Sequence, residues 1–275
     1  MNAHELRADT VSAVFVDAHG QRHTAVDKVD LGIGSGTSIG IVGQSGSGKS
    51  SLARMLAGLA TPSEGAVRYN GDDVVALLNR TRDRLRFRAA VQFIGQDTTS
   101  SFDPMRTLRD SVRTPAQRLL GMNRAQADAA VDALLPQLSL PPELANRYPR
   151  EVSGGQRQRF AIARAMIVEP RILICDEIVS ALDVSIQGSV LNFLKAYVAR
   201  TGAGIAFISH GLAATAFIAD ELVVMLGGRI IERAPSADLV RSPQHEHTAA
   251  LVNASRGNGR AGRTILTRGI GEVPA

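Results

Sequence analysis

A short glycine-rich motif, GQSGSGKSS, has the residue types and the spacing of a loop that holds nucleotide phosphates. Gly43, Gly46 and Gly48 allow backbone angles that turn successive N–H groups toward an anion. Lys49 would carry a mobile positive charge to the β- and γ-phosphates, and the Ser50 hydroxyl is suited to Mg²⁺. The loop residues expected to contact the nucleotide are Gly43, Gln44, Ser45, Gly46, Ser47, Gly48, Lys49, Ser50 and Ser51. The motif predicts a nucleotide-binding protein.

The segments on either side of the motif support this interpretation. Residues 38–42, SIGIV, are typical of a buried strand, and residues 50–58 are typical of a helix that ends at a glycine. Phosphates in the loop would then lie at the positive end of a helix dipole. The alternative is a Gly/Ser-rich turn that binds nothing. The scarcity of lysine argues against it, because Lys49 is one of only three lysines among 31 basic residues.

Two carboxylates follow the apolar run ILIC. The run is typical of a parallel strand buried on both faces, and ligand-handling residues of open α/β sheets lie at the carboxyl ends of strands. Asp176 is suited to Mg²⁺, and Glu177 could polarise the water that attacks a γ-phosphate. Alone, the pair could be two solvated carboxylates. With the phosphate loop upstream, the catalytic interpretation is favoured.

Gln96 and His210 each lie close to the end of a predicted strand. The strand at residues 91–95 delivers Gln96, which could join Mg²⁺ or the attacking water to the segment that follows. His210 comes directly after the strand at residues 204–209 and could contact the γ-phosphate. A lone histidine at a strand end is also commonly structural or solvated, and both interpretations stay open at this point.

A second candidate anion site begins at Ser153, which suits the N-cap of a helix. Gly154 and Gly155 would expose backbone N–H groups at the positive end of that helix. The site cannot easily serve a phosphate already held at Lys49, so we expect it to serve a nucleotide bound by another subunit. From spacing alone, an ordinary capped helix is equally consistent with the pattern.

Composition and length restrict the class of protein. At 275 residues the chain suits one domain, or a core domain with an insertion. No apolar run approaches the roughly 18 residues of a membrane span, and the N-terminus lacks the apolar stretch of a signal peptide. Any membrane role is therefore expected to be peripheral. The single cysteine, Cys175, excludes an internal disulfide and suits a reducing cytoplasm.

Positive charge gives only a weak argument about partners. The net charge is +5, and residues 80–88 contain five arginines. This stretch is either a basic patch for nucleic acid or a solvated helix face before a strand, and the second interpretation is favoured.

Strand-like and helix-like segments alternate along the chain. Strands are expected at residues 11–16, 25–31, 39–42, 65–71, 91–95, 171–176, 204–209, 221–225 and 229–232, and a helix at 183–200. This alternation indicates an α/β fold with a largely parallel sheet, and the last two strands form a hairpin around Gly227-Gly228. Residues 97–155 predict an inserted, mostly helical subdomain, and residues 251–275 a disordered tail.

Together these motifs resemble the nucleotide-binding subunit of an ABC transporter over residues 20–250. GQSGSGKSS resembles the Walker A loop, ILICDE the Walker B strand, and VSGGQ the family signature, which usually begins with Leu rather than Val152. Gln96 matches the Q-loop, Asp183 in SALD the D-loop, and His210 the switch histidine. The segments GQDTTSSFDP, RYPREVSGGQRQRFAIARA and SALDVSIQGSVLNFL resemble the importer subfamily for oligopeptides, dipeptides or nickel.

The resemblance implies a P-loop NTPase core formed by residues 1–250, with a parallel sheet, an antiparallel β subdomain and an inserted helical subdomain at about 97–155. It implies ATP and Mg²⁺ as ligands, with Glu177, His210 and Gln96 in hydrolysis and Ser50, Gln96 and Asp176 at the metal. ATP would lie between the Walker A loop of one subunit and the signature of a second ATPase subunit, identical or different. The residues expected to act across that interface are Ser153, Gly154, Gly155, Gln156 and Asp183.

The resemblance also implies membrane partners. Coupling helices of two membrane-spanning permease subunits would contact the residues after Gln96, and an extracytoplasmic solute-binding protein would act indirectly. We therefore expect a peripheral protein on the cytoplasmic face of the cell membrane that energises import of peptides or a similar solute, with nickel or a metal chelate also possible. The alternative function is a soluble ABC ATPase acting on nucleic acid or ribosomes. No nucleic acid is expected here, because such proteins usually carry two cassettes or a long coiled-coil insertion.

The sequence departs from the subfamily pattern near several of these motifs. The departures are Ile178-Val179 for the usual Pro-Thr, Gly211 for the usual Asp, and Glu246-His247 for the usual Pro-Tyr. They remove no catalytic group but leave loop geometry, and hence the turnover rate, open. The aromatic residue that would stack on adenine also stays open, with Phe15 and His19 as the candidates upstream of the loop.

Overall fold

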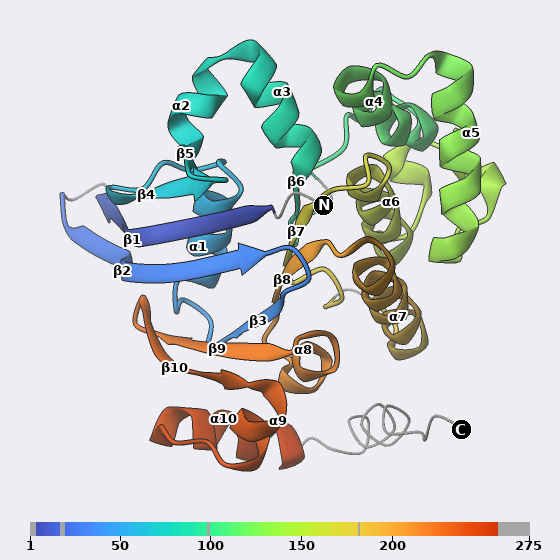
Figure 1. Ribbon diagram of the computed structural model, residues 1–275. Coiled ribbons are helices and arrows are strands. Elements are labelled where there is room, and N and C mark those ends of the chain that lie inside the picture. The colour runs from blue at the N-terminus through green and yellow to red at the C-terminus, as the bar shows by residue number, and fades with distance from the viewer. Residues whose placement is uncertain (1–3, 17–19, 98–99, 181, 258–275) are drawn as a thin grey trace.

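The structure, a computed structural model, describes residues 4–16, 20–97, 100–180 and 182–257. Two β-sheets with helices around them make up this part of the chain (Figure 1). Within it, no helix is long and apolar enough to cross a membrane.

The larger sheet has six strands in the order β10-β9-β3-β8-β7-β6. They are β3 (Ser38–Val42), β6 (Val91–Ile94), β7 (Ile172–Asp176), β8 (Gly204–Ile208), β9 (Glu221–Leu226) and β10 (Arg229–Pro235). β3 is parallel to β8 and β9, and β7 is parallel to β6 and β8, whereas β10 forms an antiparallel hairpin with β9. Every residue of β3, β7 and β8 is buried, which explains their continuous apolar sequences. The predicted largely parallel sheet is confirmed.

This strand order decides where the functional motifs meet. The carboxyl ends of parallel neighbours lie at one edge of the sheet. The phosphate loop follows β3, Gln96 follows β6, Glu177 follows β7 and His210 follows β8. Segments that are far apart in the sequence are therefore brought to the same edge.

The second sheet is antiparallel, with the strand order β2-β1-β4-β5. Its strands are β1 (Glu5–Val16), β2 (Arg22–Gly34), β4 (Glu64–Tyr69) and β5 (Asp72–Asp73). β1 and β2 are longer than the predicted segments 11–16 and 25–31. The register of β1 shifts between Ala8 and Val14, and these shifts interrupt the alternation on which the prediction depended.

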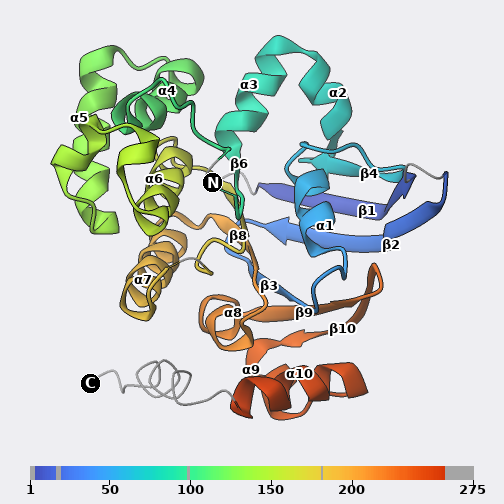
Figure 2. The same ribbon diagram turned by 180° about the vertical axis from the view of Figure 1, so that it is seen from behind.

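Helix α1 (Lys49–Leu56) lies between the two sheets (Figure 2). Leu52 and Leu56 are fully buried in one cluster with side chains of β1 and β2 on one side and of β3 and β7 on the other. Burial of an apolar side chain of this size contributes roughly 1.5–3 kcal/mol. The packing fixes the N-terminus of α1, which begins directly after the phosphate loop.

The predicted inserted subdomain is helical in its described part. It contains α4 (Leu108–Leu120), α5 (Arg124–Leu134), three short 3₁₀ turns (Leu135–Leu138, Pro142–Asn146 and Pro149–Glu151) and the start of α6 (Gly154–Met166). Arg113 bridges to Asp128 at 3.1 Å, which joins α4 to α5. In both views these helices lie on the side of β6 and β7 away from the antiparallel sheet (Figures 1 and 2).

The arginine-rich stretch forms α3 (Thr81–Ala90), which follows α2 (Val74–Asn79) and precedes β6. Arg88 donates hydrogen bonds to the carbonyl oxygens of Ala57, at 2.6 Å, and Gly58, at 2.9 Å. These carbonyls end α1, so the guanidinium satisfies groups that a helix terminus otherwise leaves unpaired. The expected solvated helix before a strand is confirmed, and one of its arginines is structural.

The chain continues through α7 (Val184–Thr201), α8 (Leu212–Ile218), α9 (Ser236–Arg241) and α10 (Glu246–Gly257). The expected disordered tail needs a correction at its start, because residues 251–257 belong to α10. Val252 is 1% exposed and packs in the core cluster that includes Leu212, which accounts for this order. Residues 258–275 lie outside the described part of the chain.

Candidate functional site

The phosphate loop has the glycine-dependent conformation that its sequence predicts. Gly43, Gly46 and Gly48 have φ angles of 156°, 79° and 97°. A Cβ at Gly48 would lie 2.1 Å from the carbonyl oxygen of Ala25, and one at Gly43 would lie 2.3 Å from that of Met225. At both positions a side chain is therefore excluded for two reasons: the backbone angle, and the close approach of another strand.

Lys49 is the first residue of α1, and its side chain turns back over the loop. Its Nζ donates to the carbonyl oxygens of Gly43, at 2.8 Å, and Gln44, at 2.7 Å. Burial lowers the pKa of this ammonium, while the neighbouring carboxylates of Glu177 and Asp176 oppose the change. The lysine thus fixes the loop and places a positive charge inside it.

Ser50 connects the loop to the end of β7. Its hydroxyl donates a hydrogen bond of 3.2 Å to Oδ1 of Asp176. Burial raises the pKa of Asp176, and the hydrogen bond from Ser50 acts in the opposite direction. The two side chains supply oxygen atoms next to each other, which is the donor chemistry that Mg²⁺ prefers. The residues at this point therefore fit a magnesium ion.

Glu177 and His210 approach each other at the same edge of the sheet. His210 Nδ1 lies 3.7 Å from Oε2 of Glu177, and the imidazole is largely exposed. The Glu177 backbone has a φ of 53°. Its N–H donates to the carbonyl oxygen of Ile208 at 2.9 Å, which fixes the start of the loop against β8.

A cavity of about 330 Å³ lies directly beside these groups. Its walls come from loop residues 45–51 together with His23, Ala25, Gln96 and Glu177. The structure therefore brings the predicted loop, Gln96 and Glu177 to one cavity. Asp176 and His210 do not line this cavity. Asp176 is hydrogen-bonded to Ser50, which does line it, and His210 lies next to Glu177, which also does.

His23 was missed by the sequence analysis. It lies in β2 and pairs in register with Phe15 of β1, so the two side chains belong to the same face of the hairpin. Phe15 is 55% exposed and His23 lines the cavity. The other candidate for contact with adenine, His19, lies outside the described residues. An aromatic ring upstream of the loop was the available signal, but only the lining of the cavity shows that the ring of His23 reaches it.

The second predicted anion site begins α6. The Ser153 hydroxyl accepts a hydrogen bond from the N–H of Gln156, and the Gln156 side chain accepts one from the N–H of Ser153. This reciprocal pair is a capping box, and Gly154 and Gly155 form the first turn. The segment is separate from the cavity beside Lys49, because none of its residues lines that cavity. Asp183, the N-cap of α7, is exposed and does not line it either.

The departures from the subfamily pattern fit the structure locally. Ile178 and Val179 are buried, at 0% and 4% exposure, directly after Glu177. Gly211 is the N-cap of α8, and its N–H donates to the Ser209 hydroxyl at 3.0 Å. Glu246 opens α10, where its negative charge lies at the positive end of the helix.

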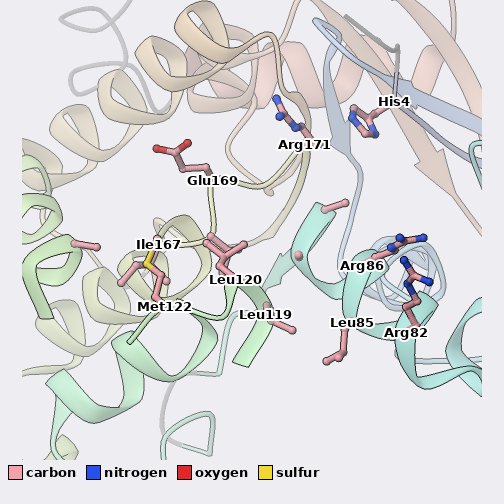
Figure 3. A pocket seen from close by; sticks show the side chains of 14 residues that line it. His4, Arg82, Leu85, Arg86, Leu119, Leu120, Met122, Ile167, Glu169 and Arg171 are labelled. Atoms are coloured by element: carbon pink, nitrogen blue, oxygen red, sulfur yellow. The ribbon is translucent and has the colours of Figure 1, made fainter. Parts of the chain in front are cut away.

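Figure 3 shows a second concavity, of about 820 Å³. No residue of the phosphate loop lines it. We call it the α3 groove, because it runs between α3, the end of α4 and residues 167–171. Its ionisable lining residues are His4, Arg82, Arg86, Glu169 and Arg171, and its large apolar ones are Leu85, Leu119, Leu120, Met122 and Ile167. Leu85 and Leu120 are 40% and 42% exposed. The groove thus combines an apolar floor with an excess of positive charge.

Comparison with known proteins places these features in a family. Residues 26–180 match the family model described as ABC transporter. The probable peptide ABC transporter ATP-binding protein y4tS of Sinorhizobium fredii is 39% identical over 251 residues, which cover 91% of this chain and 70% of that protein. The oligopeptide transport ATP-binding protein OppF of Lactococcus lactis is 38% identical over 230 residues, which cover 84% of this chain and 72% of that protein.

A solved structure shares the fold. The dimeric structure of MJ0796, a bacterial ABC transporter cassette, matches with a TM-score of 0.78 at 24% identity, covering 84% of this chain and 98% of that one.

Proposed function

The chain belongs to the ABC transporter family, and from this premise we propose that it is the subunit that binds and hydrolyses ATP to energise a peptide importer. One arrangement carries the proposal: the phosphate loop, Ser50 and Glu177 line one cavity, while Asp176 is bonded to Ser50 and His210 lies beside Glu177. The relatives named for peptide or oligopeptide transport support the class of solute. A nickel or metal chelate remains an alternative solute for the same machinery.

The loop and Lys49 bind the phosphates in this proposal. Backbone N–H groups of the loop and the N-terminus of α1 face an anion, and Lys49 exchanges its bonds to the carbonyls of Gly43 and Gln44 for phosphate oxygens. Ser50, Asp176 and Gln96 would hold Mg²⁺. When bound, the ion supplies positive charge that stabilises the phosphate oxygens of the transition state.

Glu177 acts on the attacking water. Its carboxylate accepts a hydrogen bond from that water and orients it toward the γ-phosphate, at the cavity that Glu177 lines. His210, 3.7 Å from the Glu177 carboxylate, is placed to hold that carboxylate and to contact the γ-phosphate. Gln96 lines the same cavity and directly precedes the helical subdomain, so it connects the bound nucleotide with that subdomain.

A second ATPase subunit completes the site. Ser153, Gly154, Gly155 and Gln156 start a helix, and none of them lines the nucleotide cavity of this chain. They serve instead the nucleotide of a partner subunit, with Asp183 at the same interface. The partner is either a second copy of this chain or a sister ATPase.

His23 holds the adenine ring. Among the residues that line the cavity, His23 carries the aromatic ring, and a base can stack on such a ring regardless of hydrogen bonding. Phe15 extends the same face of the hairpin.

The α3 groove is where a membrane-spanning permease subunit docks. An apolar floor with Arg82, Arg86 and Arg171 at its rim suits an amphipathic helix that carries acidic residues. Two such subunits, and indirectly an extracytoplasmic solute-binding protein, would complete the importer. This assembly places the chain on the cytoplasmic face of the membrane.

The proposal is tested by affinity purification of the tagged full chain from its native cells, with ATPase activity assayed with and without added peptides. We expect two membrane subunits and a sister ATPase, or a second copy, to co-purify. Recovery of ribosomes or nucleic acid without a membrane partner would keep the ATPase and overturn the transport function.

A further inference from the structure

The side chain of Gln187 fastens the first turn of α7 to the loop that follows Glu177. Its Nε2 donates two hydrogen bonds, 3.0 Å to the carbonyl oxygen of Val179 and 2.9 Å to that of Leu182. A carboxamide nitrogen has two N–H donors, so both are used here. Because both neighbours are carbonyl oxygens, the nitrogen of the amide and not its oxygen must face them.

The loop that Gln187 holds begins at a residue with an unfavourable backbone conformation. Glu177 has a φ of 53°, which lies in the left-handed region where a side chain crowds the backbone. Such a conformation persists only where the surroundings fix it. At Glu177 the carbonyl oxygen accepts a hydrogen bond of 2.8 Å from the Ser180 hydroxyl, and the N–H is bonded to Ile208.

The next turn of the loop depends on Gln187. The N–H of Leu182 donates to the carbonyl oxygen of Val179 at 3.1 Å, and Gln187 bonds the carbonyls of both residues. The N–H of Gln187 itself donates to the Asp183 carbonyl oxygen at 2.8 Å, within the first turn of α7. One residue of α7 therefore holds the carbonyls at both ends of a turn that begins two positions after Glu177.

We call the two hydrogen bonds from Gln187 to the carbonyls of Val179 and Leu182 the Gln187 clamp. The residues after Glu177 explain why this loop needs such a clamp. A proline directly after Glu177 would restrict one φ angle through its ring, whereas Ile178 leaves that angle free. Ile178 instead buries its side chain completely, and Val179 is 4% exposed. Packing and the two bonds from Gln187 then restrict the loop in place of the ring.

We propose that Gln187 is a positioning residue for ATP hydrolysis, which keeps the Glu177 carboxylate aimed at the nucleotide cavity by holding the carbonyls of Val179 and Leu182. It acts through the loop, because it does not itself line that cavity. The proposal rests on the function proposed above for Glu177.

The test is steady-state ATP hydrolysis by the full chain with its co-purified partners, measured together with ATP affinity. Gln187→Met removes both donors at similar volume and should lower kcat about ten-fold or more, because two hydrogen bonds to the loop are lost. The Kd for ATP should stay within about two-fold, because the phosphate loop is untouched. Gln187→Lys, which restores N–H donors on a side chain of similar length, should recover kcat to within about three-fold.

Two further variants control the result. Asn192→Met makes the same kind of change at an exposed position of α7 and should leave kcat unchanged. Gln187→Glu places acceptor oxygens against the two carbonyls and should behave like Gln187→Met. If Gln187→Met does not fold, the contrast between an active Gln187→Lys and an inactive Gln187→Glu carries the test.

Three outcomes would overturn the proposal. Normal kcat in Gln187→Met or in Gln187→Glu would show that the clamp is not needed. Equal losses of kcat and ATP affinity, or no recovery with lysine, would indicate a merely structural role.

Glu177→Gln is measured in parallel. Normal turnover in that variant would overturn the role of Glu177 as well, whereas normal turnover in Gln187→Met alone would overturn only the clamp.

Discussion

The Ser50 hydroxyl donates a 3.2 Å hydrogen bond to Oδ1 of Asp176, a residue 126 positions away in the chain. This bond joins the phosphate loop after β3 to the end of β7, across the intervening strand β8. It brings two oxygen donors together at a buried point, where a carboxylate without a cation is unfavourable. Under the proposed function, a Mg²⁺-bound nucleotide would offset a cost that the free protein carries at this point.

The variant Asp176→Asn measures that cost. Burial raises the pKa of Asp176, so the folded state binds this proton more tightly than the unfolded chain does. The free energy of unfolding therefore falls as the pH rises from the ordinary aspartate pKa through the raised pKa, and the loss is complete above the raised pKa. We expect Asp176→Asn to raise the Tm of the nucleotide-free protein at about pH 8, and to raise it less at about pH 4, close to the ordinary pKa of an aspartate.

The same variant should respond weakly to Mg-ATP. At a fixed ligand concentration a tighter ligand raises Tm more, and Asn lacks the charge that would hold Mg²⁺. Thermal unfolding at both pH values, with and without Mg-ATP, provides the comparison. A lower Tm for nucleotide-free Asp176→Asn at pH 8, or an unchanged Mg-ATP shift, would contradict the assignment.

Lys49→Ala should weaken ATP binding by about ten-fold or more, because charge-assisted hydrogen bonds to phosphate are lost. The loop should also loosen, since Lys49 holds the carbonyls of Gly43 and Gln44. Titration calorimetry with ATP gives the affinity. Lys195→Ala is the matched control, because Lys195 is an exposed lysine bonded to the carbonyl of Phe217. Equal affinities of the two variants would count against the phosphate role of Lys49.

His23→Ala should reduce affinity for ATP by roughly five-fold or more, the range expected for loss of one aromatic stacking partner. Affinity for inorganic triphosphate should not change, because the phosphate loop is intact. His23→Tyr should restore ATP binding. Competition titrations with a fluorescent nucleotide compare these variants with Phe15→Ala. A larger effect at Phe15 than at His23 would move the adenine contact to β1.

Arg86→Glu should reduce co-purification of membrane subunits and leave ATP affinity unchanged, because it reverses a charge on the rim of the α3 groove. Arg84→Glu is the matched control, since Arg84 is exposed on the same helix but does not line the groove. Quantitative mass spectrometry of the purified complexes measures the recovery. Equal recovery with the two variants would show that the groove does not receive the partner.

The sequence predicts much of this site because its chemistry depends on short motifs next to buried strands. The apolar runs at β3, β7 and β8 are recognisable without tertiary information, and each carries its polar residues at the carboxyl end. A parallel sheet then brings these ends together. The predicted loop, Gln96 and Glu177 meet at one cavity for this reason.

Features that depend on pairing between distant segments could not be predicted. His23 lines the cavity and its strand partner Phe15 does not, and β1 contains register shifts that the sequence pattern does not reveal. Gln187 appears in sequence as one polar residue on a helix. Only its two bonds to the loop after Glu177 distinguish it. The order of residues 251–257 likewise comes from packing of Val252 in the core.

The most direct test of the central claim is phosphate release from Mg-ATP by the wild-type complex and by Glu177→Gln, with ATP affinity measured for both. The account predicts that the variant binds ATP at least as tightly as the wild type. It also predicts that phosphate release falls by about a hundred-fold or more, because the carboxylate that acts on the attacking water is gone. Wild-type phosphate release by Glu177→Gln would contradict the account.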